Sequence, residues 1–397
     1  MAKAKRISRQ TTNVADARRR FLGGAAAVGG AATLATLAGC GLGGDSTPGK
    51  KAAVSGTGLP VTTLRMQAGF SAKDPFFDRA SEYVGMVSDL TGGNLKIEMS
   101  VAGAVVGAFD QADAVHKGIL DGSLAVPAFW YGKNTALSLF GTGPAFGQDA
   151  NTLLAWFEYG GGKALYDELY RDILKLDVVG FLFGPMICQP LGWFRKEVKT
   201  AKEFQGLKYR TVGLSIDVFK HMGASVVALP GGDIVPAIER GVIDAAEYNN
   251  AASDAALGFP DVAKVCMVQS YHQPGECFEI LINRKVWDAM PEIYRHVLRI
   301  ASKAASSEMY WKTLDLYSKK YEETRDQRSV KFIETPADIL NAELNAWDKV
   351  IAEKSAENPF FAKVVESQKV FMKRVVDFQM KFIVQPDLAY KHFFTKA

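Results

Sequence analysis

The chain has 397 residues, of which 48% are hydrophobic and 23% charged, so it is long enough for two globular domains with substantial cores. Its formal net charge is +4, but residues 1–39 carry seven Lys and Arg against one Asp, which leaves the remainder of the chain at −2. The basic character therefore belongs to the N-terminal segment, and no nucleic acid is expected as a partner.

The first forty residues have the pattern of an export signal. Arg18 and Arg19 precede a Gly- and Ala-rich apolar stretch over 23–39, which is typical of a twin-arginine signal. A transmembrane helix is the alternative, but the stretch is short and poor in large apolar residues. It ends in Leu37-Ala38-Gly39-Cys40, which resembles the lipobox of bacterial lipoproteins. Residues 1–40 are therefore predicted to send the protein to the periplasm, with Cys40 as a lipid anchor.

Residues 41–60 are rich in Gly, Ser, Thr, Pro and Lys and are expected to form a flexible tether. The four cysteines, Cys40, Cys188, Cys266 and Cys277, form no Cys-x-x-Cys pair or Cys/His cluster, which disfavours a zinc site. Cys188 and Cys277 would pair in an oxidising compartment or remain buried thiols, and the sequence leaves both open.

From residue 61 strand and helix patterns alternate, which indicates an α/β fold. Over 75–90 apolar residues recur at helical spacing, and Thr91-Gly92-Gly93 ends that helix. The other elements expected in the first half are strands at 61–67, 95–101 and 123–129 and a helix at 109–120.

The second half repeats the alternation. The expected strands are 178–182, 192–194, 207–210, 225–229, 242–247 and 278–282, and the expected helices are 215–222 and 233–240. Asp233 is predicted to cap the latter helix at its N-terminus, with Pro236 in its first turn.

Long helices dominate the C-terminal part, at 301–328, 337–354 and 362–381. Such helices need a partner surface, either the α/β domains of the same chain or a second subunit. The last helix and its end carry more apolar residues than one buried face requires, including Val370, Phe371, Phe378 and Phe382, which predicts a homodimer.

Three segments together resemble a known family. They are Gln189 with Gly192-Trp193-Phe194-Arg195, Gly206-Leu207-Lys208-Tyr209-Arg210, and the long run from Gly231 to Tyr248. They resemble the periplasmic solute-binding subunits of tripartite ATP-independent periplasmic (TRAP) transporters, in the branch that binds 2-oxo and 2-hydroxy monocarboxylates.

The resemblance implies a two-domain periplasmic-binding-protein-like fold with hinge strands and long C-terminal helices. Domain I would comprise 61–187 with about 277–310, and domain II would comprise 188–276. Residues 311–397 would form the C-terminal helices that clamp the domains or a partner subunit.

The predicted ligand-binding residues are Arg210, Gln189, Glu247, Trp130 and Tyr131. Arg210 follows an apolar strand segment, and its planar guanidinium can hold a carboxylate through two parallel N–H···O bonds. A surface arginine is the alternative. Trp130 and Tyr131 belong to an aromatic run that lines the ligand cavity in the resembling family and would otherwise be core.

The resemblance also implies a metal site made of Gln189, Glu247, the carbonyl of Tyr248 and Gln273. These are hard oxygen ligands that suit sodium or calcium. The resembling proteins have Glu at the position of Gln273, and one negative charge fewer favours sodium over calcium, with no metal at all as the alternative.

The expected function is therefore capture of a small 2-oxo or 2-hydroxy acid, such as pyruvate or lactate, for delivery to the TRAP membrane permease subunits. The chain has no G-x-S-x-G or H-E-x-x-H motif, so we expect no enzyme, and an exported metal-assisted hydrolase is the weaker alternative. A sensory lipoprotein that presents its ligand to a receptor is the other alternative.

Overall fold

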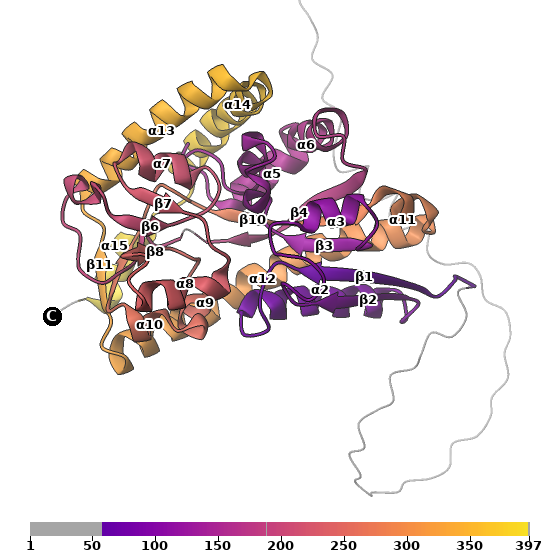
Figure 1. Cartoon of the computed structure of the whole chain (residues 1–397), viewed down its shortest axis with the longest axis horizontal. Coiled ribbons are helices and arrows are strands. Elements are labelled where there is room, and N and C mark those ends of the chain that lie inside the picture. The colour runs from indigo at the N-terminus through magenta and orange to yellow at the C-terminus, as the bar shows by residue number, and fades with distance from the viewer. Residues whose placement is uncertain (1–57, 188, 396–397) are drawn as a thin grey trace, which may run out of the picture. The chain divides into compact units, whose positions relative to one another are not determined.

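Two mixed β-sheets organise the part of the chain that this computed structural model describes, residues 58–187 and 189–395 (Figure 1). Sheet A has the strand order β2-β1-β3-β10-β4 and sheet B the order β11-β9-β5-β8-β6-β7. The strands of sheet A are β1 (Thr62–Ala68), β2 (Leu95–Ser100), β3 (Gly122–Ala125), β4 (Val178–Met186) and β10 (Glu276–Asn283). The strands of sheet B are β5 (Gly192–Phe194), β6 (Lys208–Arg210), β7 (Ser225–Val227), β8 (Ala245–Ala246), β9 (Val265–Val268) and β11 (Lys331–Glu334).

Helices surround both sheets. The α-helices up to β10 are α2 (Pro75–Leu90), α3 (Gln111–His116), α4 (Ser138–Gly141), α5 (Ala150–Tyr159), α6 (Gly162–Glu168), α7 (Ser215–His221), α8 (Gly231–Glu239), α9 (Ala251–Leu257) and α10 (Phe259–Val262). After β10 follow α11 (Arg284–Ala289), α12 (Glu292–Gln327), α13 (Ala337–Glu357), α14 (Pro359–Phe382) and α15 (Pro386–Phe394). Short helical turns are η1 (Pro127–Trp130), η2 (Thr135–Leu137), η3 (Leu169–Ile173) and η4 (Ala201–Phe204).

The predicted α/β fold with long C-terminal helices is confirmed. Helix α2 has the predicted bounds, because the Asp74 side chain accepts the N–H of Phe76 at the N-terminus and Thr91 ends the helix. Its buried side chains, Phe76, Ala80, Tyr83 and Val87, form one face.

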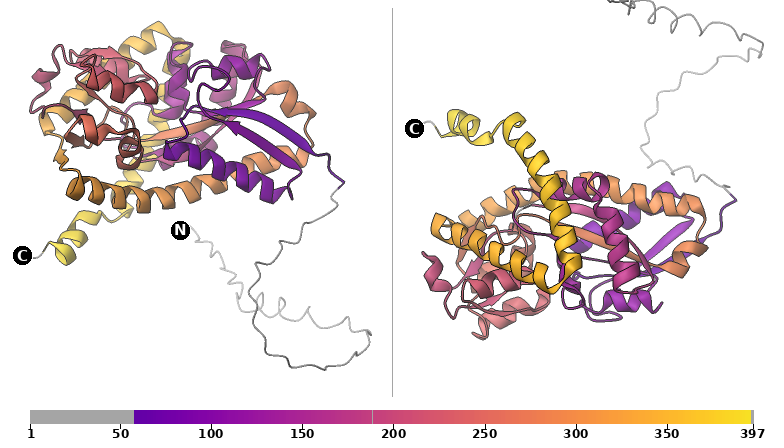
Figure 2. Two further views of the ribbon diagram at one scale, coloured as in Figure 1. Left: turned by 60° about the horizontal axis from the view of Figure 1, so that its bottom comes forward. Right: turned by 90° about the horizontal axis from the view of Figure 1, so that it is seen from above.

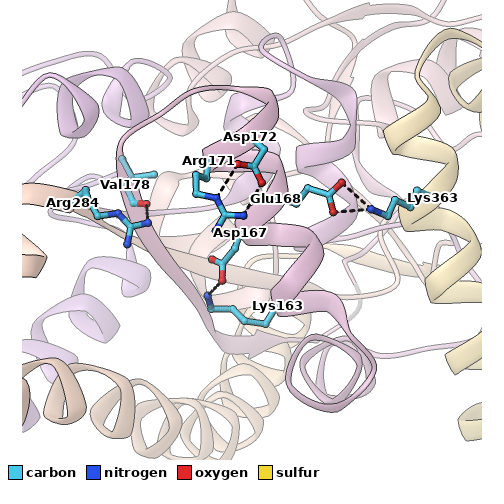
Figure 3. Close-up of polar contacts among 8 residues, drawn as sticks. All are labelled: Lys163, Asp167, Glu168, Arg171, Asp172, Val178, Arg284 and Lys363. Atoms are coloured by element: carbon cyan, nitrogen blue, oxygen red, sulfur yellow. Dashed lines mark hydrogen bonds and ion pairs between the residues drawn. The ribbon is translucent and has the colours of Figure 1, made fainter.

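The chain passes between the sheets at 187–191 and at 269–275, and a third time through α12, which leads to β11. Helix α12 packs against α2 and β4 on the side of sheet A and against α9 on the side of sheet B (Figure 2, left). Helix α13 packs on α7, and α14 packs on α5 and α6. Lys363 of α14 reaches both carboxylate oxygens of Glu168 at the end of α6, at 2.8 and 2.7 Å (Figure 3).

Several elements differ from the expectation. Helix α8 begins at Gly231, so Asp233 lies in its first turn instead of capping it, and Pro236 lies inside the helix. Strand β3 ends at Ala125, because Pro127 opens the 3-10 turn η1 that carries the aromatic run. The strands β9 and β11 and the helices α4, α5, α6, α9, α10, α11 and α15 were not predicted.

The strands of sheet A all fall in the predicted domain I, and those of sheet B in domain II except β11. The domain division itself stays a prediction, since the described residues belong to one compact unit. The export signal, Cys40, most of the tether and Cys188 lie outside the described residues. Cys266 and Cys277 are buried free thiols. Within the described ranges, every helix is too short or too polar to cross a membrane.

Candidate functional site

Arg210 and Glu247 form a buried ion pair at the carboxyl ends of two neighbouring strands of sheet B. Arg210 ends β6, and Glu247 directly follows β8, which pairs with β6. Arg210 Nη1 lies 2.9 Å from Glu247 Oε1, and the side chains are 1% and 0% exposed. Ligand sites of open α/β sheets form at such strand ends, so the structure brings two predicted site residues together where the fold favours a site.

The Arg210 guanidinium is already engaged. Its Nε and Nη2 donate to the carbonyl of Leu229, and its Nη1 donates to the carbonyl and the side chain of Glu247. Of the five N–H groups, only the second one on Nη2 has no partner among the described residues. Two parallel bonds to a ligand carboxylate, as expected from the sequence, would therefore require one of these contacts to open.

Burial raises the pKa of Glu247, and the Arg210 charge and hydrogen bond oppose that rise. Its second oxygen, Oε2, is buried and has no hydrogen-bond partner within the described part of the chain. A buried carboxylate oxygen without a donor is costly, so this atom is a candidate ligand for a cation.

Gln189 and Gln273 lie next to each other on the two crossings between the sheets. The N–H of Gln189 donates to the carbonyl of Gln273 at 3.3 Å, and both side chains are buried. Neither polar atom of the Gln273 side chain makes a hydrogen bond to another described residue. The amide thus offers a second buried oxygen without a hydrogen-bond donor among the residues that the structure describes.

Glu276, which the sequence analysis did not single out, also belongs to this cluster. It is the first residue of β10 and 4% exposed. Burial, with the nearby Glu247 charge as the next cause, raises its pKa to about 8, while Arg210 and the neighbouring Gln273 amide lower it. Its Oε1 has no hydrogen-bond partner among the residues described. The only sequence signal for it was an acid at the start of an apolar strand.

The oxygens of Glu247, Gln273 and Glu276 without donors fit a hard cation such as sodium or calcium. The described residues contain no group of three or more His, Cys, Asp or Glu that could hold a metal. The set is thus two carboxylates with amide and carbonyl oxygens, which does not suit zinc.

Tyr248 links the chain after β8 of sheet B to the start of α2, which packs beside sheet A. Its hydroxyl donates to the Asp74 carboxylate at the N-terminus of α2, and its ring lies 5.8 Å from the Arg210 guanidinium carbon. Burial raises the pKa of Asp74 to about 6. The predicted role of the Tyr248 carbonyl as a metal ligand remains a prediction.

Trp130 and Tyr131 line a cavity of about 360 Å³. Across from them lie Val212, Ile216 and Ala228, close in sequence to Arg210 and its partner Leu229. The Trp130 indole N–H donates to Glu279, and the Tyr131 hydroxyl donates to Asp217 on α7.

The predicted polar ligands Arg210, Gln189, Glu247 and Gln273 are buried and are not among the residues that line this cavity. His272 adds no positive charge near neutral pH, since burial lowers its pKa to about 3. Arg210 is therefore the cation that the cluster offers to an anionic ligand.

Residues 66–358 match the sequence family described as bacterial extracellular solute-binding protein, family 7 (DctP). A periplasmic protein of Nostoc sp. described as binding monocarboxylate 2-oxoacids is 29% identical over 321 residues, which cover 80% of this chain and 86% of that protein.

Two solved structures are also similar. A TRAP transporter solute-binding protein from Bordetella bronchiseptica, with calcium and picolinate in a dimer of mixed occupancy, has a TM-score of 0.79 at 28% identity and covers 85% of this chain and 98% of its own. One from Pseudoalteromonas atlantica, with bound sodium and pyruvate, has a TM-score of 0.76 at 29% identity, over 84% of this chain and 99% of its own.

Proposed function

Because the chain belongs to family 7 of the bacterial extracellular solute-binding proteins, the receptors of TRAP transporters, we propose that it captures a small 2-oxo or 2-hydroxy carboxylic acid and delivers it to the membrane permease subunits. As in the rest of this family, the chain is a binding protein and not an enzyme. The observation that carries the proposed ligand class is the buried Arg210–Glu247 pair beside a cavity of about 360 Å³ walled by aromatic side chains.

The arrangement suits an acid with a short side chain. Arg210 would supply a charged donor to the carboxylate, and the aromatic wall of Trp130 and Tyr131 would contact the apolar end. The similar proteins from Nostoc and Pseudoalteromonas are described with 2-oxoacids and with pyruvate, which supports this class.

We further propose that a cation lies between the ligand and the buried carboxylates. Glu247, Gln273, Glu276 and Gln189, with the carbonyl of Tyr248, would hold it, and its positive charge would offset the repulsion between these acids and an anionic ligand. The similar structures contain calcium in one case and sodium in the other. We favour sodium because Arg210 already neutralises Glu247 and the amide of Gln273 adds no charge, which leaves Glu276 as the one carboxylate of this set without a cationic partner among the described residues.

Titration calorimetry with pyruvate, in buffers with sodium, with calcium and with neither ion, tests both proposals. We expect pyruvate to bind with sodium present and to bind at least about tenfold more weakly without either ion, since a desolvated charge pair contributes a few kcal/mol. Binding that is equal in all three buffers would exclude the cation, and no binding of pyruvate or lactate in any buffer would exclude the ligand class.

Export by the twin-arginine route, lipidation at Cys40 and a homodimer complete the proposal. Cys40→Ser should release the protein from the membrane fraction into the soluble periplasm, because one lipid attachment site is removed. Arg18→Lys/Arg19→Lys should leave the precursor in the cytoplasm. A wild-type protein that is already soluble and begins downstream of Cys40 would refute the anchor.

A further inference from the structure

An inner strand of sheet A, β10, carries a buried carboxylate with three hydrogen-bond donors. Glu279 of β10 is 1% exposed; its Oε2 accepts the indole N–H of Trp130 at 2.6 Å. Its Oε1 accepts the hydroxyls of Tyr166 and of Tyr170, the latter at 2.7 Å. Each oxygen therefore has a partner, and no cation is among these partners.

The local packing allows the Tyr166 hydroxyl to reach Glu279. Side chains alternate along β10, so Glu279 faces the same apolar cluster as Cys277 and Leu281, which also contains Trp130, Tyr166 and Tyr170. Gly180 of β4 pairs with Leu281. A Cβ atom at Gly180 would overlap the Tyr166 hydroxyl, so only glycine lets this hydroxyl cross the strand to Glu279.

The two tyrosines come from one short helical segment, in α6 and in the π-helical turn η3 that follows it. Their rings lie 4.7 Å apart and face inward. Ion pairs of Lys163 with Asp167 and of Arg171 with Asp172 lie on the exposed side of the segment (Figure 3). The inner face of the segment thus presents its two hydroxyls to one carboxylate.

A purely structural role explains this cluster poorly. A buried acid without a cation is costly to ionise: burial raises the pKa of Glu279, and its hydrogen bonds from Tyr166, Trp130 and Tyr170 oppose that rise. Apolar side chains of similar volume often replace even buried ion pairs without loss of stability. What Glu279 provides is a fixed orientation of Trp130, because a buried indole N–H takes a position that satisfies its hydrogen bond. Trp130, which is 1% exposed, is in turn one of the residues that line the 360 Å³ cavity.

We propose that Glu279 is a positioning residue that, together with Tyr166 and Tyr170, locks the Trp130 indole as a rigid wall and thereby sets which side-chain size the ligand cavity accepts. The inference rests on the proposed function, since it assigns the size selection of that same site. A rigid wall gives different affinities for ligands that differ by a few methylene groups, whereas a mobile indole would bind both with similar affinity.

The test compares the dissociation constants of two probes, pyruvate and 4-methyl-2-oxopentanoate, in the sodium-containing buffer. Glu279→Gln keeps the volume but loses an acceptor and adds two donors. We expect its ratio of dissociation constants to move towards one by at least about fivefold, because pocket shape discriminates such ligands by about 10- to 200-fold. Glu343→Gln, the same change at another buried glutamate that is bonded to Ser270 and Tyr271, is the matched control and should keep the wild-type ratio.

A second readout follows Trp130 directly. In protein labelled with 5-fluorotryptophan, the fluorine signal that disappears in Trp130→Phe belongs to Trp130 among the six tryptophans. We expect Glu279→Gln to shift or broaden this signal and Glu343→Gln to leave it in place. Should Glu279→Gln not fold, Tyr166→Phe, which removes one donor to Oε1, is measured instead and should give a smaller effect in the same direction.

The double variant Glu279→Gln/Trp130→Phe completes a double-mutant cycle. In the Trp130→Phe background, Glu279→Gln should not change the ratio of the two dissociation constants any further. The inference is overturned if the ratio of Glu279→Gln stays within twofold of wild type, if the effect persists without the Trp130 indole, or if the wild-type protein binds both probes equally. A wild-type protein that binds neither probe instead rejects the proposed ligand class, and the fluorine signal then still reports whether Glu279 orders Trp130.

Discussion

Arg210 has two tasks at the scale of a single residue. Four of its N–H groups hold Leu229 and Glu247, and the fifth remains for a ligand. Removal of the whole side chain would leave Glu247 buried without its counter-ion, which is strongly destabilising. Arg210→Lys is therefore a better probe of binding than Arg210→Ala, because it keeps the charge but loses the planar fork.

Arg210→Lys is expected to weaken binding of pyruvate by more than about tenfold, since an altered buried charge pair costs about 2–5 kcal/mol. Calorimetry on the folded variant measures this. Arg195→Lys is the control, because its guanidinium also donates to backbone carbonyls, those of Ile238 and Glu239, but lies outside the site. Wild-type affinity in Arg210→Lys would remove Arg210 from the ligand site.

The sequence was sufficient for residues whose position follows from a strand end. Arg210 and Glu247 each follow an apolar strand segment, and the structure pairs them at 2.9 Å. It was insufficient for Glu276 and Glu279, which lie 29 and 32 residues beyond Glu247 in a strand that reads as apolar core. Glu276 interacts with Arg210 and Glu247, which are distant in sequence. Glu279 accepts a hydrogen bond from Trp130, which lies 149 positions away.

At the scale of elements, local signals predicted the long helices and most strands, but they missed the shorter helices α5, α6, α9, α10 and α11 and the strands β9 and β11. Helix α2 carries a cap, an apolar face and a glycine stop within its own sequence. Strand β11 has only four residues, none of them buried, and depends on its pairing with β9 some 60 residues earlier. Helix α15 was missed because none of its residues is buried, so no apolar face against this chain defines it.

The end of α14 and helix α15 leave large apolar side chains exposed. Phe378 is 55% and Phe382 is 72% exposed, and the two rings stack at 4.8 Å. Apolar surface of this extent on adjacent helices is typical of a subunit interface. We therefore expect the protein without residues 1–57 to be a dimer in light scattering at micromolar concentration.

Phe378→Ser/Phe382→Ser should convert this dimer into a monomer, because both rings leave the interface while the buried face of α14 at Phe361 and Val365 stays intact. Lys373→Ser, at an exposed position of the same helix, is the control and should remain dimeric. A monomeric wild-type protein under the same conditions would mean that these side chains serve another surface.

For the whole molecule, two side-chain contacts bridge elements next to different sheets. Tyr248 after β8 donates to Asp74 before α2, and Tyr131 after η1 donates to Asp217 on α7. The chain crosses between the sheets at two strand connections and through α12, so the two sheets can move relative to each other. The two contacts favour the arrangement in which the sheets are closed over the one in which they are open.

We expect saturating pyruvate to reduce the radius of gyration in solution scattering, and Tyr131→Phe/Tyr248→Phe to raise it in the absence of ligand. The double variant should also bind more weakly, because fewer molecules occupy the closed state. Tyr83→Phe is the control, since its hydroxyl bonds to Leu298 within the α2–α12 layer. Identical curves with and without pyruvate would contradict a closing motion.

Stability of the ligand-free molecule should fall as the pH rises, because several buried carboxyls hold their protons more tightly in the folded state. Burial raises the pKa of Glu343 on α13 from 4.5 to about 7. Between these values the folded protein keeps the proton and the unfolded chain loses it, so this residue alone lowers the free energy of unfolding by about 3 kcal/mol at pH 8.

Glu343→Gln mimics the protonated acid. In urea unfolding, this variant should be as stable as wild type at pH 4 and more stable than wild type at pH 8. Asp348→Asn, at an exposed position on the same helix, should follow wild type, and parallel pH profiles of wild type and Glu343→Gln would show that Glu343 is ionised in the folded protein.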